Sequence, residues 1–96
     1  MLHIVNKSPY ERNALESCLR LAQSGSALLL IEDGVYAAIK TGSAASKLSG
    51  LDVAALDADL KARGVSEDKL VEGVKVVDYA DFVDLVEAKD KVQSWL

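Results

Sequence analysis

The sequence contains few of the residues on which small enzymes and secreted domains depend. Among its 96 residues there are one cysteine, one histidine and one tryptophan, and aromatic residues make up 5% of the chain. A single cysteine cannot form an internal disulfide, which excludes the class of disulfide-stapled secreted domains. One histidine and one cysteine also leave a metal without an evident set of ligands, so we predict no metal site.

Positive charge is also scarce. The chain has 11 Lys and Arg residues against 15 Asp and Glu residues, a formal net charge of −4. Proteins that hold nucleic acid place cations against its phosphates, and this balance has the wrong sign. We therefore expect no direct contact with nucleic acid.

Long hydrophobic runs are absent from the sequence. The longest, Ala27–Ile31, is far shorter than the roughly 20 apolar residues that span a membrane. The first residues, MLHIVNKSP, lack the basic segment and the apolar stretch of a secretory signal. We expect a cytoplasmic protein that does not enter a membrane.

Half of the residues are hydrophobic, and they are arranged in short blocks. Four blocks have the length of strands, and segments with helical signals separate them. Short apolar strands joined by helices predict a mostly parallel sheet that is covered on both faces. We predict one domain over residues 1–96, a small three-layer α/β domain of flavodoxin- or Rossmann-like type with about four to five strands. The four blocks are residues 2–5, 27–31, 51–56 and 74–77.

The first helix has the clearest start signal. Ser8 can cap it, Pro9 suits its first position, and Glu11 completes a capping box. A rotation of about 100° per residue then places an apolar stripe on one face, and Gly25 ends the helix. The stripe consists of Ala14, Leu15, Cys18, Leu19 and Ala22.

Two later helices are predicted from the residues at their ends. Asp57 caps a two-turn helix that Gly64 closes, and Asp78 caps a last helix over residues 79–88. These two caps place the remaining helices after the third and fourth apolar blocks.

Ligands of open parallel sheets bind at the carboxyl ends of the strands. In this chain those ends are residues 6–8, 32–34, 57–59 and 78–81. Capping alone accounts for the aspartates of the last two segments. Asp33-Gly34 is explained less fully, because a turn into a short helix over residues 35–39 requires the glycine but not the acid before it. Turn chemistry is the favoured interpretation there, and a ligand site is the alternative.

Three common functions of small α/β domains are excluded because the residues that they require are missing. No glycine-rich phosphate motif follows any strand. A low-molecular-weight phosphatase needs an arginine six residues after its cysteine, where this chain has Ser24, and a receiver domain needs an acidic pair where this chain has Asn6-Lys7. We predict no bound cofactor. His3 lies within a predicted strand, which favours a structural role.

Cys18 and Trp95 each allow two interpretations of their role. Cys18 lies about two and a half turns into the predicted helix, too far for the helix N-terminus to lower its pKa. Its stripe neighbours are apolar, which favours a packed core cysteine. Trp95, next to last in the chain, either closes the core or marks an interface.

Several segments together resemble the DsrH/TusB family, the smallest subunit type of the DsrEFH and TusBCD sulfur-relay complexes. The resemblance follows the order of the chain over nearly its whole length, through MLHIVNKSPYERNALESCL, IEDGVYAAI, LDADLKARG, VVDYADFVDL and VQSWL. The combination of LH with SP, DG-V-x-AA, DL-x-ARG and DY-x-x-FV is specific, although each piece alone is weak.

The resemblance implies a DsrE-like subunit that assembles with DsrE/TusD-like and DsrF/TusC-like subunits into a heterohexamer with two copies of each. These complexes pass persulfide sulfur to a DsrC/TusE-type carrier, for 2-thiolation of tRNA wobble uridine in the Tus branch or for sulfur oxidation in the Dsr branch. Their principal sulfur-accepting cysteine belongs to the DsrE/TusD-type subunit. We therefore expect an accessory, mainly structural subunit, and leave open whether it performs a chemical step itself.

Cys18 bears on the choice of branch. Dsr-type subunits resemble this chain in carrying a cysteine in the first helix, whereas Tus-type subunits commonly lack it. The resemblance therefore favours the DsrH type and makes Cys18 a candidate secondary persulfide site. The alternative outside the family is a free-standing α/β binding module with a ligand near Asp33-Gly34.

Overall fold

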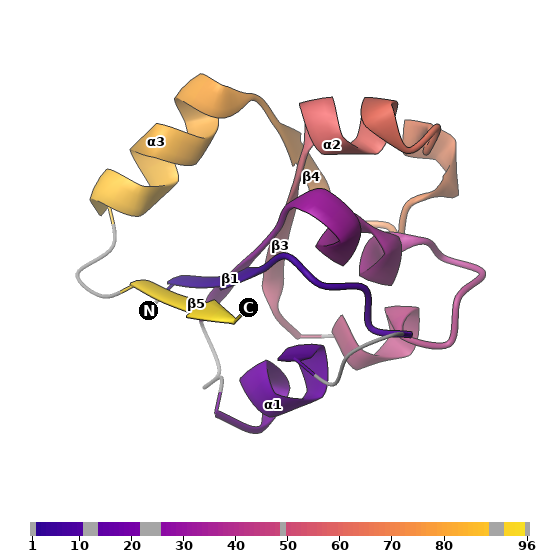
Figure 1. Cartoon of the computed structure of the whole chain (residues 1–96), viewed down its shortest axis with the longest axis horizontal. Helices are drawn as coiled ribbons and strands as arrows, with labels where there is room; N and C mark the ends of the chain where they lie inside the picture. Colours follow the sequence, from indigo (N-terminus) through magenta and orange to yellow (C-terminus); the bar gives the residue numbers. More distant parts are fainter. Residues whose placement is uncertain (1, 11–13, 22–25, 49, 89–91, 96) are drawn as a thin grey trace.

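A five-stranded sheet forms the centre of the molecule (Figure 1), in a computed structural model that describes residues 2–10, 14–21, 26–48, 50–88 and 92–95. All strand pairs are parallel, and the strand order is β4-β3-β2-β1-β5. The strands are β1 Leu2–Val5, β2 Ala27–Leu30, β3 Asp52–Leu56, β4 Lys75–Val77 and β5 Val92–Trp95. The α-helices are α1 Ala14–Leu21, α2 Asp57–Ala62 and α3 Tyr79–Ala88, and the 3-10 helices are η1 Glu32–Ala38, η2 Ala45–Leu48 and η3 Glu67–Lys69.

The order of the strands explains the three layers. From β1 to β4 the chain moves across the sheet in one direction, and it then returns past β1 to add β5 at the opposite edge. Right-handed crossovers place connections in one direction on one face and a connection in the reverse direction on the other. Residues of α1, η1, η2 and α2 accordingly pack on one face of the sheet, and residues of α3 pack on the other. The predicted three-layer α/β class is confirmed.

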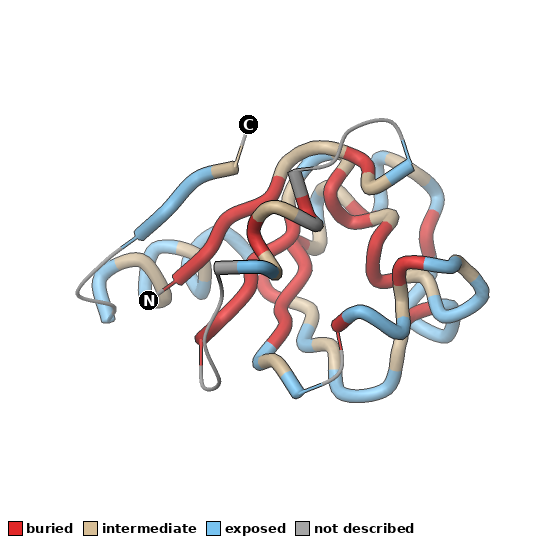
Figure 2. Tube along the Cα trace, turned by 90° about the horizontal axis from the view of Figure 1, so that it is seen from below, coloured by how far each residue is buried: buried red, intermediate tan, exposed pale blue. Residues whose placement is uncertain are grey.

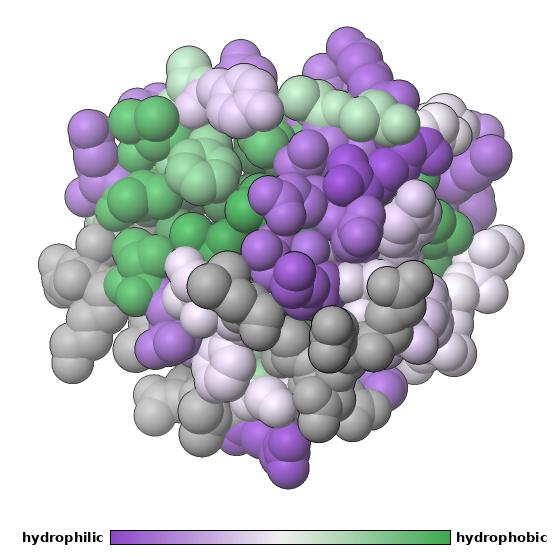
Figure 3. All heavy atoms as spheres, in the orientation of Figure 1, coloured by the Kyte–Doolittle hydropathy of each residue, from purple (hydrophilic) through white to green (hydrophobic). Residues whose placement is uncertain are grey.

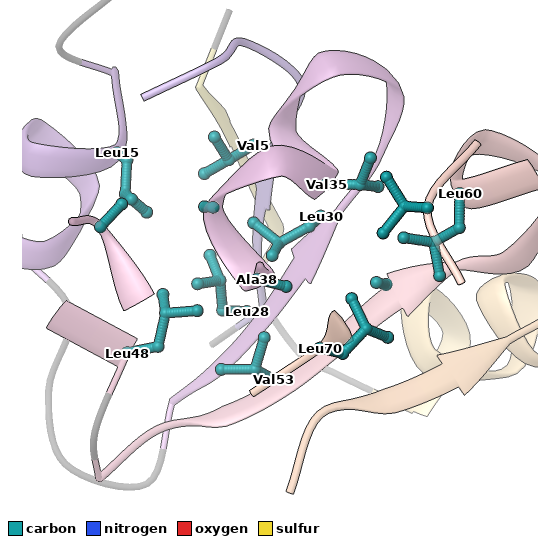
Figure 4. Close-up of a cluster of buried hydrophobic side chains, with 14 of the residues drawn as sticks. Val5, Leu15, Leu28, Leu30, Val35, Ala38, Leu48, Val53, Leu60 and Leu70 are labelled. Atoms are coloured by element: carbon teal, nitrogen blue, oxygen red, sulfur yellow. The ribbon is translucent and has the colours of Figure 1, made fainter. Parts of the chain in front are cut away.

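The first face of the sheet carries the larger core. Val5, Leu28 and Leu30 of the strands form one buried cluster with Leu15 of α1 and Leu60 of α2 (Figure 4), and all five are at most 2% exposed. Figure 2 shows the buried segments concentrated in the central strands and the loops that cover them. The continuous apolar blocks thus fill both faces of the sheet, as parallel strands require.

The second face of the sheet is covered by α3. Phe82, Leu85 and Val86 of this helix pack against strand residues that include Leu29 and Leu56. No residue of α3 is buried, and a mostly apolar groove of about 360 Å³ opens between the helix and the strands. This layer is therefore packed less completely than the first.

The start of the first helix differs from the prediction. Pro9 and Tyr10 form a turn, and the described part of the helix begins at Ala14. Ser8 Oγ accepts a hydrogen bond from the Tyr10 N–H at 3.2 Å, and the Tyr10 hydroxyl accepts the Ala44 N–H at 3.4 Å. Ser8 thus caps a turn that a distant segment holds in place. The positions predicted for the capping glutamate, the last stripe residue and the closing glycine, residues 11, 22 and 25, lie outside the described residues.

The predicted caps of the later helices are confirmed except for one. Asp57 is the first residue of α2 rather than its cap, and its Oδ2 pairs with Lys61 Nζ at 3.0 Å. Gly64 follows α2 with a φ of 67°, the left-handed conformation that ends a helix. At α3, Asp78 Oδ1 accepts the Asp81 N–H at 2.8 Å and Asp81 Oδ2 accepts the Asp78 N–H at 3.2 Å, a reciprocal cap.

Two further differences concern the type of structure. The helix predicted over residues 35–39 is a 3-10 helix that begins earlier, at Glu32. The segment Val92–Trp95, which we predicted only to hold a core or interface tryptophan, is the fifth strand. Among the described helices none is both long enough and apolar enough to cross a membrane.

Candidate functional site

Polar side chains gather where β2 and β3 end. Arg63 Nε donates to Asp33 Oδ1 at 2.8 Å, and Arg63 Nη1 lies 3.6 Å from Asp59 Oδ1. Asp59 Oδ2 also accepts the Glu32 N–H at 2.8 Å, and Glu32 Oε2 accepts a hydrogen bond from Asn6 Nδ2 at 3.5 Å. The candidate acids at this edge are therefore held by partners within the chain.

Arg63 is the central cation of this cluster. Its hydrogen bond to Asp33, followed by the charges of Asp33 and Asp59, raises the pKa of the Arg63 guanidinium above its usual value. Glu32 has a φ of 48°, which is rare for a residue with a side chain. Because the carboxylate of Asp59 accepts the Glu32 N–H, the same cluster also supports this backbone conformation. No local signal in the sequence indicates that Arg63 pairs with Asp33, because the two residues are 30 positions apart.

Gly34 is required by a close approach and not by a turn. It has no positive φ, and a Cβ at this position would lie 2.2 Å from the Val5 carbonyl oxygen. The backbone of η1 therefore packs directly on the end of β1. The ion pair with Arg63 accounts for Asp33, and packing against β1 accounts for Gly34.

Cys18 lies in the core of the first face. Its exposed fraction is 0%, and it belongs to the same buried cluster as Leu15 and Val5. Burial raises the pKa of the Cys18 thiol to about 11. Since the thiolate is the form that attacks sulfur, both burial and pKa oppose chemistry at this position in the isolated chain.

His3 and Trp95 join the first and last strands of the chain. Trp95 Nε1 donates a hydrogen bond to His3 Nδ1 at 3.1 Å, and the two ring centroids are 6.1 Å apart. His3 is 2% exposed and Trp95 is half-buried. Because Nδ1 accepts, the imidazole is neutral and carries its proton on Nε2. Burial, together with the charge of the N-terminal amine, lowers the pKa of His3.

This pair predicts a dependence of stability on pH. An unfolded histidine has a pKa of about 6.5, so it binds a proton more readily than folded His3 does. We expect the free energy of unfolding to be constant above about pH 6.5 and to fall as the pH drops from there toward the folded pKa. Thermal unfolding, followed by fluorescence of Trp95 between about pH 7.5 and pH 5, measures this loss.

The control is His3→Asn, which keeps an acceptor near the position of Nδ1 but cannot be protonated. This variant is expected to lose most of the decline below about pH 6.5. An equal decline in the variant and the wild type would assign the effect to other groups.

Similarity to known proteins over nearly the whole chain identifies its family. A family model described as "DsrH like protein" matches residues 7–92. The chain belongs to the DsrH/TusB family. The protein TusB of Sodalis glossinidius (strain morsitans) is 39% identical over 97 residues, which cover 99% of this chain and all of that protein. The protein TusB of Escherichia coli (strain K12 / DH10B) is 34% identical over the same coverage.

Solved structures support the fold. The crystal structure of the ychN protein from E. coli superposes with a TM-score of 0.81 over 97% of each chain, at 23% sequence identity. The solution structure of protein Tm0979 from Thermotoga maritima superposes with a TM-score of 0.65 over 95% of this chain and 97% of that chain, at 27% identity. Both similarities agree with the parallel α/β sheet.

Membership in the DsrH/TusB family makes the protein a subunit of a multi-subunit sulfur-relay complex. The segments by which the sequence resembles the family meet in the fold. The histidine of the LH pair contacts the tryptophan of VQSWL, the aspartate of DG-V pairs with the arginine of ARG, and the aspartate of DY caps α3. These contacts therefore stabilise the domain.

Proposed function

We propose that this protein is a structural subunit of a cytoplasmic TusBCD-type complex that passes persulfide sulfur toward a TusE-type carrier and serves the 2-thiolation of tRNA wobble uridine. Its companions are a DsrE/TusD-like and a DsrF/TusC-like subunit, with two copies of each of the three chains. The observation that carries the proposal is full-length similarity to TusB proteins at 34% to 39% identity.

The proposal assigns the sulfur chemistry to the DsrE/TusD-like companion. In each transfer, the acceptor thiolate attacks the outer sulfur of the donor persulfide. A new sulfur–sulfur bond forms, the donor bond breaks, and the donor leaves as a thiolate, with no net oxidation or reduction. The acceptor must be exposed and ionised for this step. Cys18 is fully buried and its pKa is raised to about 11, which supports a packing role.

The choice of the Tus branch rests on the relatives. The resemblance favours the DsrH type because Cys18 lies in the first helix, and the family model is described as "DsrH like protein". The curated relatives at 34% to 39% identity are named TusB. A cysteine that packs in the core gives little reason to prefer the branch in which this position would carry sulfur.

Charge also agrees with an indirect role in tRNA modification. The formal net charge is −4, and α3 adds an exposed acidic surface without a basic residue. Such a chain repels the phosphate backbone, so the proposal leaves contact with tRNA to downstream proteins.

The first test follows sulfur by intact mass spectrometry. The chain, alone and assembled with its DsrE/TusD-like and DsrF/TusC-like companions, is exposed to a persulfide donor. We expect added sulfur on the DsrE/TusD-like companion and none on this chain, with equal yields for the wild type and for Cys18→Ala or Cys18→Ser. One added sulfur on this chain, lost in both variants, would instead make Cys18 a relay site.

The second test addresses the branch. Deleting the gene in its host is expected to remove 2-thiouridine from the tRNAs that carry it, as measured by nucleoside mass spectrometry. Normal 2-thiouridine together with a defect in the oxidation of stored sulfur would contradict the Tus assignment and support the Dsr branch.

A further inference from the structure

Helix α3 exposes an apolar pair that no other segment of the described chain covers. Tyr79 is 64% exposed and Val83 is 50% exposed. The two residues are four positions apart and therefore lie on the same side of the helix. Figure 3 shows hydrophobic residues gathered over α3 and over the surface between α3 and β5.

This exposed pair continues the apolar surface by which α3 packs on the sheet. Phe82 and Val86, which contact the second core cluster, are themselves only partly buried. At about 100° per residue, Tyr79 and Val83 extend the apolar side of the helix beyond the angle that faces the sheet. A stripe of this width is typical of a helix with two apolar neighbours, and among the described residues α3 packs only on the sheet.

The rest of the helix surface is acidic. Its exposed carboxylates are Asp78 at the cap and Asp81, Asp84 and Glu87 along the helix. No lysine or arginine occurs in Tyr79–Ala88. A protein that covers the apolar pair therefore also meets a row of negative charges.

The charge decides between two classes of partner. In a symmetric contact with a second copy, α3 would face α3, and carboxylates would lie against carboxylates. Like charges at an interface cost several kcal/mol and oppose such a pairing. A different protein that presents lysine or arginine at the edge of an apolar strip avoids this repulsion between like charges.

We propose that α3 is the docking surface for a companion subunit of the sulfur-relay complex, with Tyr79 and Val83 as its apolar anchors and the acidic row as the complement of a basic rim. This inference rests on the proposed function, since it takes the companion from the complex. It goes further by assigning which face of this chain makes the contact and what chemistry the companion presents there.

The test compares two substitutions that add the same charge. Val83→Glu places a carboxylate in the apolar pair, and Ala58→Glu places one on an exposed position of α2. Each variant is co-expressed with the DsrE/TusD-like and DsrF/TusC-like companions, and assembly is measured by native mass spectrometry and by titration of the separate components. Thermal unfolding of each isolated chain verifies that both variants are folded.

We expect Val83→Glu to weaken assembly at least about tenfold, as substitution of an interface anchor does, and Ala58→Glu to leave it unchanged. Assembly of the wild type is also expected to weaken as salt is raised, because the rim pairs are screened. Both variants assembling as well as the wild type, or both failing equally, would overturn the assignment of α3 and leave the proposed function intact.

Two further outcomes show whether the proposed function or only the docking partner is wrong. If the wild-type chain binds neither companion, the proposed function is wrong, and the assignment of a companion subunit to α3 is wrong with it. If it binds neither companion but forms a dimer that Val83→Glu abolishes, α3 is instead the contact with a second copy.

Discussion

Replacing Gly34 with alanine is expected to lower the free energy of unfolding by about 3 kcal/mol, and the melting temperature by roughly 10 to 20 °C. The added Cβ would lie 2.2 Å from the Val5 carbonyl oxygen and 2.9 Å from its carbon. Both atoms belong to the backbone of β1, whose neighbours on both sides are strands of the sheet. The clash can therefore be relieved only by displacing η1 or the end of the central sheet. Urea unfolding monitored by circular dichroism measures the effect.

Gly42→Ala is the matched control. A Cβ there would also lie 2.2 Å from its nearest atom, but that atom is the hydroxyl oxygen of Tyr10. Tyr10 is 54% exposed, so its side chain can move away. We expect a loss of about 1 kcal/mol or less, chiefly the hydrogen bond from the Ala44 N–H to Tyr10. Equal losses for the two alanine variants would contradict the role assigned to the contact between Gly34 and β1.

Replacing Trp95 with alanine is expected to lower the free energy of unfolding by about 2 to 3 kcal/mol, near the lower end for truncation of a large aromatic because the ring is only half-buried. The ring packs against the first core cluster, and its N–H satisfies His3 Nδ1. The other residues of β5 are exposed, so the tryptophan supplies most of the side-chain contact that holds this edge strand. Hydrogen exchange of the β5 amides is expected to accelerate along with the loss of stability.

Trp95→Phe separates the ring from its N–H group. It keeps most of the apolar area and leaves the buried acceptor of His3 without a partner, which costs about 1 to 2 kcal/mol. An alanine variant within about 0.5 kcal/mol of the wild type would show that β5 is held by its backbone pairing with β1 alone.

The contacts of Gly34 and of Trp95 both stabilise the domain. Gly34 and Trp95 both stand in segments by which the chain resembles the DsrH/TusB family, and both contact β1, Gly34 at its carboxyl end and Trp95 from the neighbouring strand β5. Tyr79 and Val83 of another such segment are exposed, and the described part of the chain does not cover them. Gly34 and Trp95 therefore stabilise the domain, whereas Tyr79 and Val83 are available to a partner.

The chain by itself determined the α/β class, the first four strands and the caps at Asp78 and Gly64. These features depend on signals within a few residues, namely apolar blocks of strand length, a carboxylate three positions before an N–H, and a glycine that accepts positive φ. The parallel sheet followed, because short strands joined by helices allow few other arrangements. The resemblance to the family also came from the order of short segments along the chain.

Tertiary structure alone decided the remaining features, since each depends on contacts between distant residues. The turn at Pro9-Tyr10 is supported by the Ala44 N–H, which a local capping signal cannot reveal. Strand β5 is short and exposed, and only its pairing with β1 identifies it. Asp33 found its partner in Arg63, thirty residues away. Cys18 acquired its raised pKa from burial under the sheet, because a thiol's reactivity is set by the solvent and charges around it and not by its neighbours in sequence.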